Sequence, residues 1–141
     1  MSEINWAALQ QAAQHAAAQA YAPYSKFPVG VAVLAESGKI YTGCNVENAS
    51  YGGTVCAERN AIGAAVVAGE RKFTALMVYT PQQMLTPPCG ICRQVIAEFF
   101  SPNAPIASCN HLHQQQNWSL GELLPAAFTP TYLANSTKVG A

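Results

Sequence analysis

Residues 55–80, VCAERNAIGAAVVAGERKFTALMVYT, pass from a helical pattern into a strand pattern, and this order decides the fold. The part from Val55 to Glu70 has apolar residues on almost every side, which is typical of a helix buried inside a fold. FTALMVYT, residues 73–80, is a short apolar run that predicts a strand. Downstream, GICRQVIAEFF (90–100) predicts a second helix and APIASC (104–109) another strand. Strands that alternate with helices in this way predict parallel pairing through crossover helices.

The upstream part of the chain adds a helix and a hairpin. INWAALQQAAQHAAAQAY, residues 4–21, lacks Gly and Pro and is rich in helix-forming Ala and Gln, so it predicts a helix that stops before Pro23. Within residues 28–46, VGVAVLAE and KIYTGCNVE flank the turn SGK and predict a β-hairpin. LGELLP, residues 120–125, predicts a short helical turn, and residues 129–141 a polar, loosely ordered tail. The whole order predicts a single α/β layered domain, residues 1–141, with a mixed sheet.

Charge is scarce and balanced in this chain. Charged residues make up 10% of the 141 residues, against about 25% in an ordinary globular domain, which indicates a surface partly covered by other copies of the chain. Seven basic and seven acidic residues cancel, and there is no basic stripe, so a nucleic-acid partner is not expected. The sequence has no apolar run of about 20 residues and opens MSEINWAALQ, without a signal-peptide pattern. We therefore expect a cytoplasmic protein that has no membrane partner.

The cysteines carry the strongest chemical signal. Cys89 and Cys92 form a CxxC at the start of a predicted helix, which alone is either a redox dithiol or half of a zinc site. Cys56 also stands at the start of a predicted helix, after the loop YGG, so two helix N-termini can point at one spot. Three thiolates there would hold a Zn²⁺ ion and leave a fourth position open, which is typical of a catalytic zinc. Cys44 and Cys109 match no ligand position and are expected to be packing thiols.

Charged residues next to these cysteines fit a catalytic site. Glu58 lies two residues after Cys56, close enough to reach a water at the metal, and is a candidate proton shuttle. The alternative is an ordinary first-turn glutamate that the helix dipole stabilises. Arg59 and Arg93 each follow a ligand and offer hydrogen bonds to the sulfurs, unless they are solvated surface charges. We favour Arg59 because it lies one helical turn after Cys56.

Five segments in fixed order resemble a known family. YSKFPVGVAVL, GCNVENASYG, CAERNA, PCGICRQV and ELLPAAF are similar in order and spacing to the homotetrameric zinc-dependent cytidine deaminases, over most of residues 21–128. The resemblance implies a three-layer α/β/α fold with a mixed sheet of about five strands, and a homotetramer with one Zn²⁺ per subunit. It implies hydrolytic deamination of cytidine and 2′-deoxycytidine to uridine and 2′-deoxyuridine in pyrimidine salvage, with release of ammonia. Hydroxide would attack C4, with Glu58 as the proton shuttle.

The same resemblance implies roles for individual residues. Cys56, Cys89 and Cys92 would hold the zinc, and Asn45 and Glu47 would hold the ribose, although polar residues at a strand end also serve as caps. Phe27 would pack near the nucleoside, although most Phe residues belong to a core. The further positions that the resemblance implies are the backbone N–H of Ala57 at the pyrimidine edge, and Tyr51 and Phe128 at a neighbouring subunit's site. The sequence departs from the family pattern at Pro87, Ile91 and Ala126.

Three other functions compete with this one. A related deaminase of an aminonucleoside antibiotic such as blasticidin S would share the zinc motifs, but the stretch NVEN favours cytidine because ribose needs that pair. A deaminase that edits nucleic acids is disfavoured by the neutral charge and the short chain. A structural zinc module would have four protein ligands and no need of Glu58.

Overall fold

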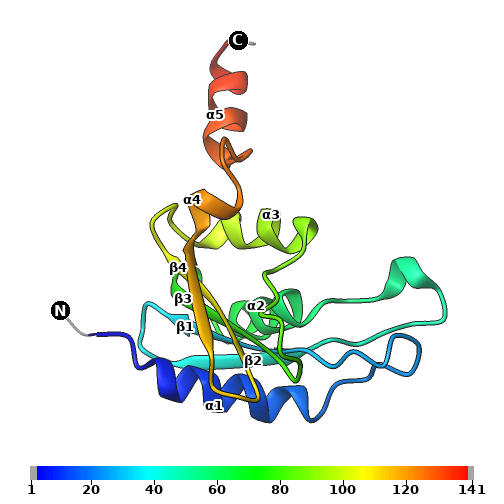
Figure 1. The fold of residues 1–141 in the computed structure, drawn as a ribbon. Coiled ribbons are helices and arrows are strands. Elements are labelled where there is room, and N and C mark those ends of the chain that lie inside the picture. Colours follow the sequence, from blue (N-terminus) through cyan, green and yellow to red (C-terminus); the bar gives the residue numbers. More distant parts are fainter. Residues whose placement is uncertain (1–2, 140–141) are drawn as a thin grey trace.

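The computed structural model describes residues 3–139, which form a five-stranded mixed sheet between layers of helices (Figure 1). The strand order is β2-β1-β3-β4-β5. The β3–β4 pair is parallel and the other three pairs are antiparallel, so the predicted mixed sheet is confirmed. The strands are β1 (Gly30–Ala35), β2 (Ile40–Cys44), β3 (Phe73–Thr80), β4 (Pro105–Asn110) and β5 (Gln115–Ser119).

Helices cover both faces of this sheet. α1 (Trp6–Ala17) buries Leu9, Ala13 and Ala17 against one face, together with Ala32, Met77 and other side chains of the strands. On the other face, three helices form a second core with the strand side chains of β1, β3 and β4 that point to that face. These helices are α2 (Ala57–Val67), α3 (Gly90–Phe99) and α4 (Leu120–Leu123). Figure 1 shows the two helical layers on opposite sides of the strands. The predicted three-layer α/β/α architecture is confirmed.

The crossover connections fix where a site can form. α2 connects β2 to β3, and α3 connects the parallel strands β3 and β4, as the alternation of patterns predicted. β2, β3 and β4 run in the same direction, and their carboxyl ends, at Cys44, Thr80 and Asn110, lie together at one end of the sheet. Helices α2 and α3 begin near these carboxyl ends, where open α/β sheets bind their ligands.

A glycine allows α2 to lie directly on the sheet. A Cβ atom at Gly43 of β2 would stand 2.4 Å from the backbone nitrogen of Ala61 and 2.7 Å from the carbonyl oxygen of Ala57. These distances are far inside van der Waals contact, so only glycine lets the helix backbone approach β2 so closely. The contact therefore fixes the first turns of α2, the helix that follows Cys56.

The structure departs from the sequence predictions in several elements. β5 was not predicted, because QQNWS has no strand-like alternation; it pairs through its backbone with the edge of β4. α1 ends at Ala17, before the predicted end. The prediction that α2 is buried on every side was wrong, because the outward face includes Val67, which is 90% exposed.

The C-terminal segment also differs from the expected tail. Residues Pro130–Val139 form a helix, α5, which extends away from the sheet (Figure 1). Proline is favoured at the first position of a helix, because its missing N–H would have no intrahelical partner there. Residues 140 and 141 of the predicted tail lie outside the described part of the chain. Among the described residues, no helix is long and apolar enough to cross a membrane.

Candidate active site

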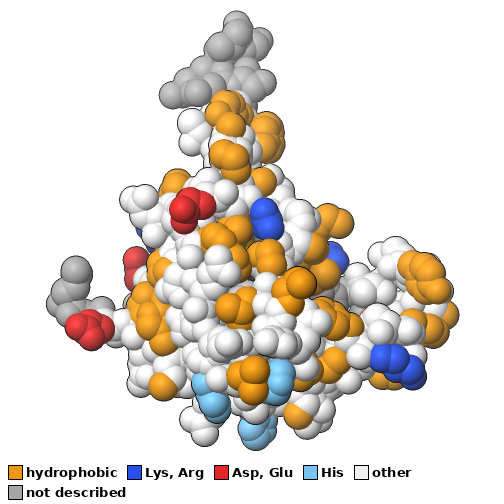
Figure 2. Space-filling view, in the orientation of Figure 1, with side chains coloured by type: hydrophobic (Ala, Val, Ile, Leu, Met, Phe, Trp, Pro, Cys, Tyr) orange, Lys and Arg blue, Asp and Glu red, His pale blue; other side chains and the backbone are white. Residues whose placement is uncertain are grey.

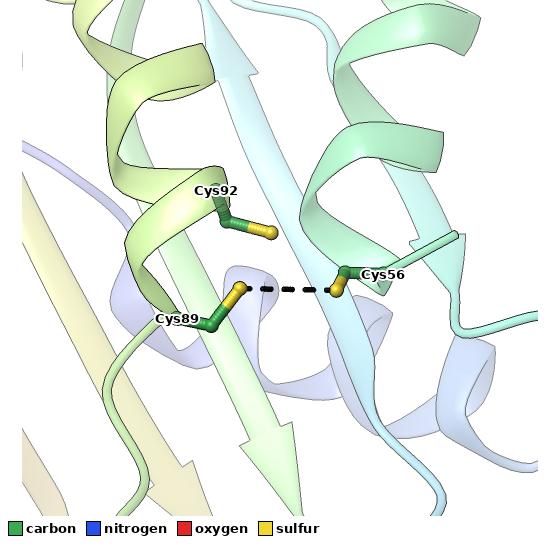
Figure 3. Close-up of side chains that lie close together, drawn as sticks. All are labelled: Cys56, Cys89 and Cys92. Atoms are coloured by element: carbon green, nitrogen blue, oxygen red, sulfur yellow. Dashed lines mark hydrogen bonds between the residues drawn. The ribbon is translucent and has the colours of Figure 1, made fainter. Parts of the chain in front are cut away.

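Three cysteine sulfurs converge where α2 and α3 begin (Figure 3). Cys56 and Cys89 are the N-cap residues of these helices, and Cys92 lies in the first turn of α3. The Sγ atoms all lie within 4.8 Å of one another, and those of Cys56 and Cys89 are 3.9 Å apart. Ligands of a tetrahedral zinc with Zn–S bonds of about 2.3 Å are separated by roughly 3.8 Å, so the three sulfurs fit one ion.

Among the three sulfurs, the thiolate form is favoured at Cys56. The hydrogen bond with Cys92 lowers the pKa of Cys56 to about 5, and the same bond raises the pKa of Cys92. Both helix N-termini also direct partial positive charge at the group. Cys109 differs, because burial raises the pKa of its thiol to about 12. Soft thiolates at this spacing are the donor set that zinc prefers, so the three cysteines fit the ion.

The two arginines next to the cysteines make different contacts. Arg59 interacts with Cys56, which raises the pKa of its guanidinium, and its Nη2 donates to the carbonyl oxygen of Thr54 at 3.2 Å. Its Nε is buried and has no hydrogen-bond partner within the described part of the chain. Arg93 instead donates through Nε to Pro88 at 2.8 Å and through Nη1 to Leu123 at 2.9 Å. Arg59 therefore lies beside the sulfur of Cys56, whereas Arg93 ties the loop before Cys89 to α4.

Glu58 lies beside the sulfurs in a cavity of about 230 Å³. Its side chain is 5% exposed and lines this cavity together with Cys56, Cys89 and Ala57. Burial raises the pKa of Glu58 to about 7. A carboxyl group with that proton affinity can accept and release a proton near neutral pH.

The other end of the cavity is polar and comes from loops. Asn45 and Glu47 both line it, together with Phe27. Asn45 is buried; its Nδ2 donates to the carbonyl oxygen of Phe27 and its Oδ1 accepts from the N–H of Val29, both at 2.9 Å. The carboxylate of Glu47 accepts hydrogen bonds from the backbone N–H groups of residues 24 and 25.

Tyr51 and Phe128 lie outside this cavity. Tyr51, in the short helix η1 (Tyr51–Gly53), is 79% exposed and contacts Tyr24 edge-on, with ring centroids 6.3 Å apart. Phe128 is 56% exposed and stacks on Tyr132 at 5.7 Å. Neither side chain is among the residues that line the cavity of the same chain.

The loops that carry Tyr24 and Tyr51 form a protruding lobe, defined here as residues 21–28 and 46–55. Figure 1 shows these segments projecting to the right of the sheet, and Figure 2 shows apolar side chains on their surface. The two segments are held together by backbone hydrogen bonds, among them Glu47 N–H to the carbonyl of Tyr21 at 2.9 Å. The lobe therefore exposes aromatic side chains next to the polar end of the cavity.

The three departures from the family pattern occupy different environments. Pro87 lines the cavity, whereas Ile91 is 65% exposed and does not. Ala126 has a φ of 53°, a left-handed conformation that favours glycine. The sequence analysis also missed Ser25, which lines the cavity beside Glu47. The signal available for it was its place in YSKF, two residues before Phe27.

Comparisons with known proteins agree with this geometry. The family model of the cytidine and deoxycytidylate deaminase zinc-binding region matches residues 5–107. A cytidine deaminase of Sporosarcina psychrophila is 49% identical over 120 residues, which cover 85% of this chain and 88% of that protein. A cytidine deaminase of Mycobacterium tuberculosis is 41% identical over 128 residues, 91% of this chain and 92% of that protein. The crystal structure of a Burkholderia pseudomallei cytidine deaminase has a TM-score of 0.84 and 44% identity, and the match covers 89% of this chain and all of that one.

The expected Zn²⁺ cofactor is confirmed by two findings. The matched family region is a zinc-binding region, and it contains all three cysteines that the structure brings together. The family model also spans more than half of the sequence. The chain therefore belongs to the cytidine and deoxycytidylate deaminase family.

Proposed function

We propose that the protein hydrolyses cytidine and 2′-deoxycytidine to uridine and 2′-deoxyuridine, with release of ammonia, in pyrimidine salvage. The observation that carries this proposal is one cavity with two chemically different ends. Glu58 and the sulfurs lie at one end, and Asn45 and Glu47 lie at the other. The first end suits hydrolysis of an exocyclic amine, and the second suits the hydroxyl groups of a sugar. The relatives' names support the same activity.

The chain's own residues account for the proton transfers. When bound, zinc supplies a Lewis acid that lowers the pKa of a water in the cavity. Glu58 takes a proton from this water and gives it to ring N3, while hydroxide adds to C4. Glu58 then takes the proton of the new C4 hydroxyl group and passes it to the amino group, so that ammonia leaves and the C4 carbonyl forms. The burial of Glu58 keeps these transfers away from bulk solvent.

The nucleoside is oriented by groups on both sides of the cavity. The backbone N–H of Ala57 would donate to the pyrimidine edge; its position at the start of α2, where an N–H has no intrahelical partner, and in the lining of the cavity supports this role. Phe27 offers an apolar face to the nucleoside, and Asn45 and Glu47 hold the sugar. A sugar held mainly through its 3′-hydroxyl explains why both cytidine and 2′-deoxycytidine are expected substrates.

Self-association completes the proposal. We expect a homotetramer with one Zn²⁺ per subunit, in which Tyr51 and Phe128 reach the cavity of a neighbouring copy. Their exposure of 79% and 56% supports this role, as does the low charge of the chain. Sedimentation equilibrium should give four times the mass of the 14.9 kDa chain, and a stable monomer that is fully active would contradict the expectation.

The test of the proposed reaction is the ultraviolet absorbance of cytidine with purified protein, before and after treatment with a strong zinc chelator. Blasticidin S is the comparison substrate. Glu58→Gln should lower kcat by about 10²–10⁴-fold, because the proton carrier is lost, and should keep the bound zinc. Glu98→Gln, an exposed carboxylate on α3, is the matched control and should leave kcat unchanged. Full activity of Glu58→Gln would disprove the mechanism, whereas a wild-type protein that binds zinc but does not deaminate would favour a structural zinc module.

A further inference from the structure

We infer that Ser25 is a positioning residue for the sugar-binding carboxylate: its hydroxyl holds Glu47 so that one acceptor position faces a single sugar hydroxyl, the 3′-hydroxyl. The inference rests on the proposed function and adds to it a residue that selects among sugars. Ser25 lies in the protruding lobe and lines the cavity together with Glu47 and Phe27.

Ser25 links the aromatic residue to the carboxylate through one hydroxyl group. The backbone N–H of Phe27 donates to Ser25 Oγ at 3.0 Å, and Ser25 Oγ donates in turn to Glu47 Oε2. Because Oγ carries only one proton, the bond it accepts from Phe27 leaves that proton free to point at Glu47. The other carboxylate oxygen, Oε1, accepts from the N–H groups of Tyr24 at 3.0 Å and Ser25 at 3.1 Å.

The remaining hydrogen-bonding capacity of Glu47 is limited. An ionised carboxylate has about four acceptor positions, and the donors named above fill both positions on Oε1 and one on Oε2. One position on Oε2 is left for a ligand. The hydrogen bond from Ser25 also lowers the pKa of Glu47, so the group is ionised at neutral pH and only accepts. Glu47 can therefore take one hydroxyl proton.

Local backbone geometry shows that the contact is built into the lobe. Lys26, between Ser25 and Phe27, has a φ of 59°, and its N–H donates to the carbonyl of Ala22 at 3.0 Å. This left-handed residue turns the chain so that Ser25 Oγ meets the N–H of Phe27. Glu47 comes from the other segment of the lobe, which lies beyond the end of β2. The Ser25 hydroxyl thus joins two loops at the point where the sugar is expected.

The experiment compares Ser25→Ala and Ser25→Thr with a matched control elsewhere. Ser37 repeats the arrangement: its Oγ donates to Glu70 Oε2 at 2.7 Å and accepts from the N–H of Lys39 at 3.4 Å, outside the cavity. Ser37→Ala removes the same kind of bond and should leave kcat/KM unchanged. Kinetics are measured with cytidine, 2′-deoxycytidine and 3′-deoxycytidine.

Ser25→Ala should lower kcat/KM on cytidine by about tenfold, mainly through KM, which is the size expected for a lost hydrogen bond to a charged group. The same loss is expected with 2′-deoxycytidine. With 3′-deoxycytidine the variant should be within about twofold of wild type, because the hydroxyl that Glu47 accepts is absent. Ser25→Thr keeps the hydroxyl and should restore most of the activity on cytidine.

An equal loss with all three substrates would overturn the inference, since a general structural defect does not distinguish between sugars. An unchanged kcat/KM on cytidine would overturn it as well. Ser25→Cys, which fills similar space with a weaker donor, provides the same comparison if Ser25→Ala does not fold. A wild-type protein that deaminates none of the three nucleosides would instead overturn the proposed function, so the two failures are distinguishable.

Discussion

The two ends of the cavity are built in different ways. The metal end comes from the first turns of α2 and α3, and these helices pack on a closed core. The end proposed to hold the sugar, called here the sugar end, comes from the protruding lobe and the adjoining Asn45, where side-chain hydrogen bonds replace long secondary structure (Figure 1). Chemistry is therefore fixed by the rigid body of the domain, whereas recognition depends on loops. Changes at the metal end should stop turnover of every substrate, and changes at the sugar end should alter affinity and preference.

The largest effect is expected at the metal end, from Cys92→Ala. Cys92 is fully buried and supplies one of the three sulfurs, so its loss leaves two ligands and a gap in the site. Bound zinc should fall from one per chain to nearly none, and kcat should drop by about 10³-fold or more for every nucleoside. Metal analysis and the cytidine absorbance assay measure both. Cys44→Ala, a thiol outside the group, is the control; retention of zinc by Cys92→Ala would contradict the ligand assignment.

At the sugar end, Asn45→Ala should have the next largest effect. The change removes the hydrogen bonds with Phe27 and Val29 and the proposed contact with the sugar, so kcat/KM should fall by about 10²-fold. Zinc content should not change, which is what separates this end from the metal end. Asn103→Ala, an exposed amide far along the chain, controls for the loss of a polar side chain. Zinc loss in Asn45→Ala would show that the two ends are not independent.

Arg59→Gln tests whether zinc binding needs the positive charge of Arg59 beside the sulfur of Cys56. Removing the cation beside Cys56 should weaken zinc binding by about 10–100-fold, the range seen for groups that support metal ligands. Competition with a chromophoric chelator measures the affinity. The preference between cytidine and 2′-deoxycytidine should stay as in wild type. Arg71→Gln, whose guanidinium binds surface carbonyls, should keep full affinity; equal weakening in both variants would remove the special role of Arg59.

The smallest effect is expected for Ile91→Ala. Ile91 stands between two ligands in the sequence, yet its side chain is 65% exposed and does not line the cavity. Substitutions of this kind change free energies by about 0.5 kcal/mol or less, so kcat/KM should stay within about twofold of wild type. Steady-state kinetics on cytidine provide the measurement. A tenfold loss would place Ile91 in contact with substrate or with another copy of the chain.

The metal end was largely predictable from the sequence, and the sugar end only in part. A cysteine at the start of each helix and a glutamate two residues later are local signals, and the resemblance supplied the roles of Asn45 and Glu47. Ser25 was missed because its partner lies 22 residues away and joins it through two loops. Spacing favoured Arg59 over Arg93, because Arg59 lies one helical turn after Cys56. The contacts of each guanidinium depend on the direction of its side chain, which spacing does not specify.

The same limit explains the fold elements that were missed. β5 forms because the edge of β4 offers unpaired backbone groups. The sequence QQNWS has no alternation of apolar residues that would predict a strand. α2 looked buried on all sides because Ala, Gly and Val are apolar, but an apolar composition does not say which side faces the sheet. The helix at residues 130–139 has a polar sequence, and such a sequence is equally typical of a loosely ordered tail.

The missing side chain at Gly43 has a consequence for anyone who wishes to redesign this protein. With α2 packed backbone to backbone on β2, a side chain at residue 43 would push the helix away, so the placement of Cys56 and Glu58 relative to the sheet depends on this glycine. A library aimed at new nucleosides should therefore keep this glycine and diversify the lobe, which contributes none of the three sulfurs.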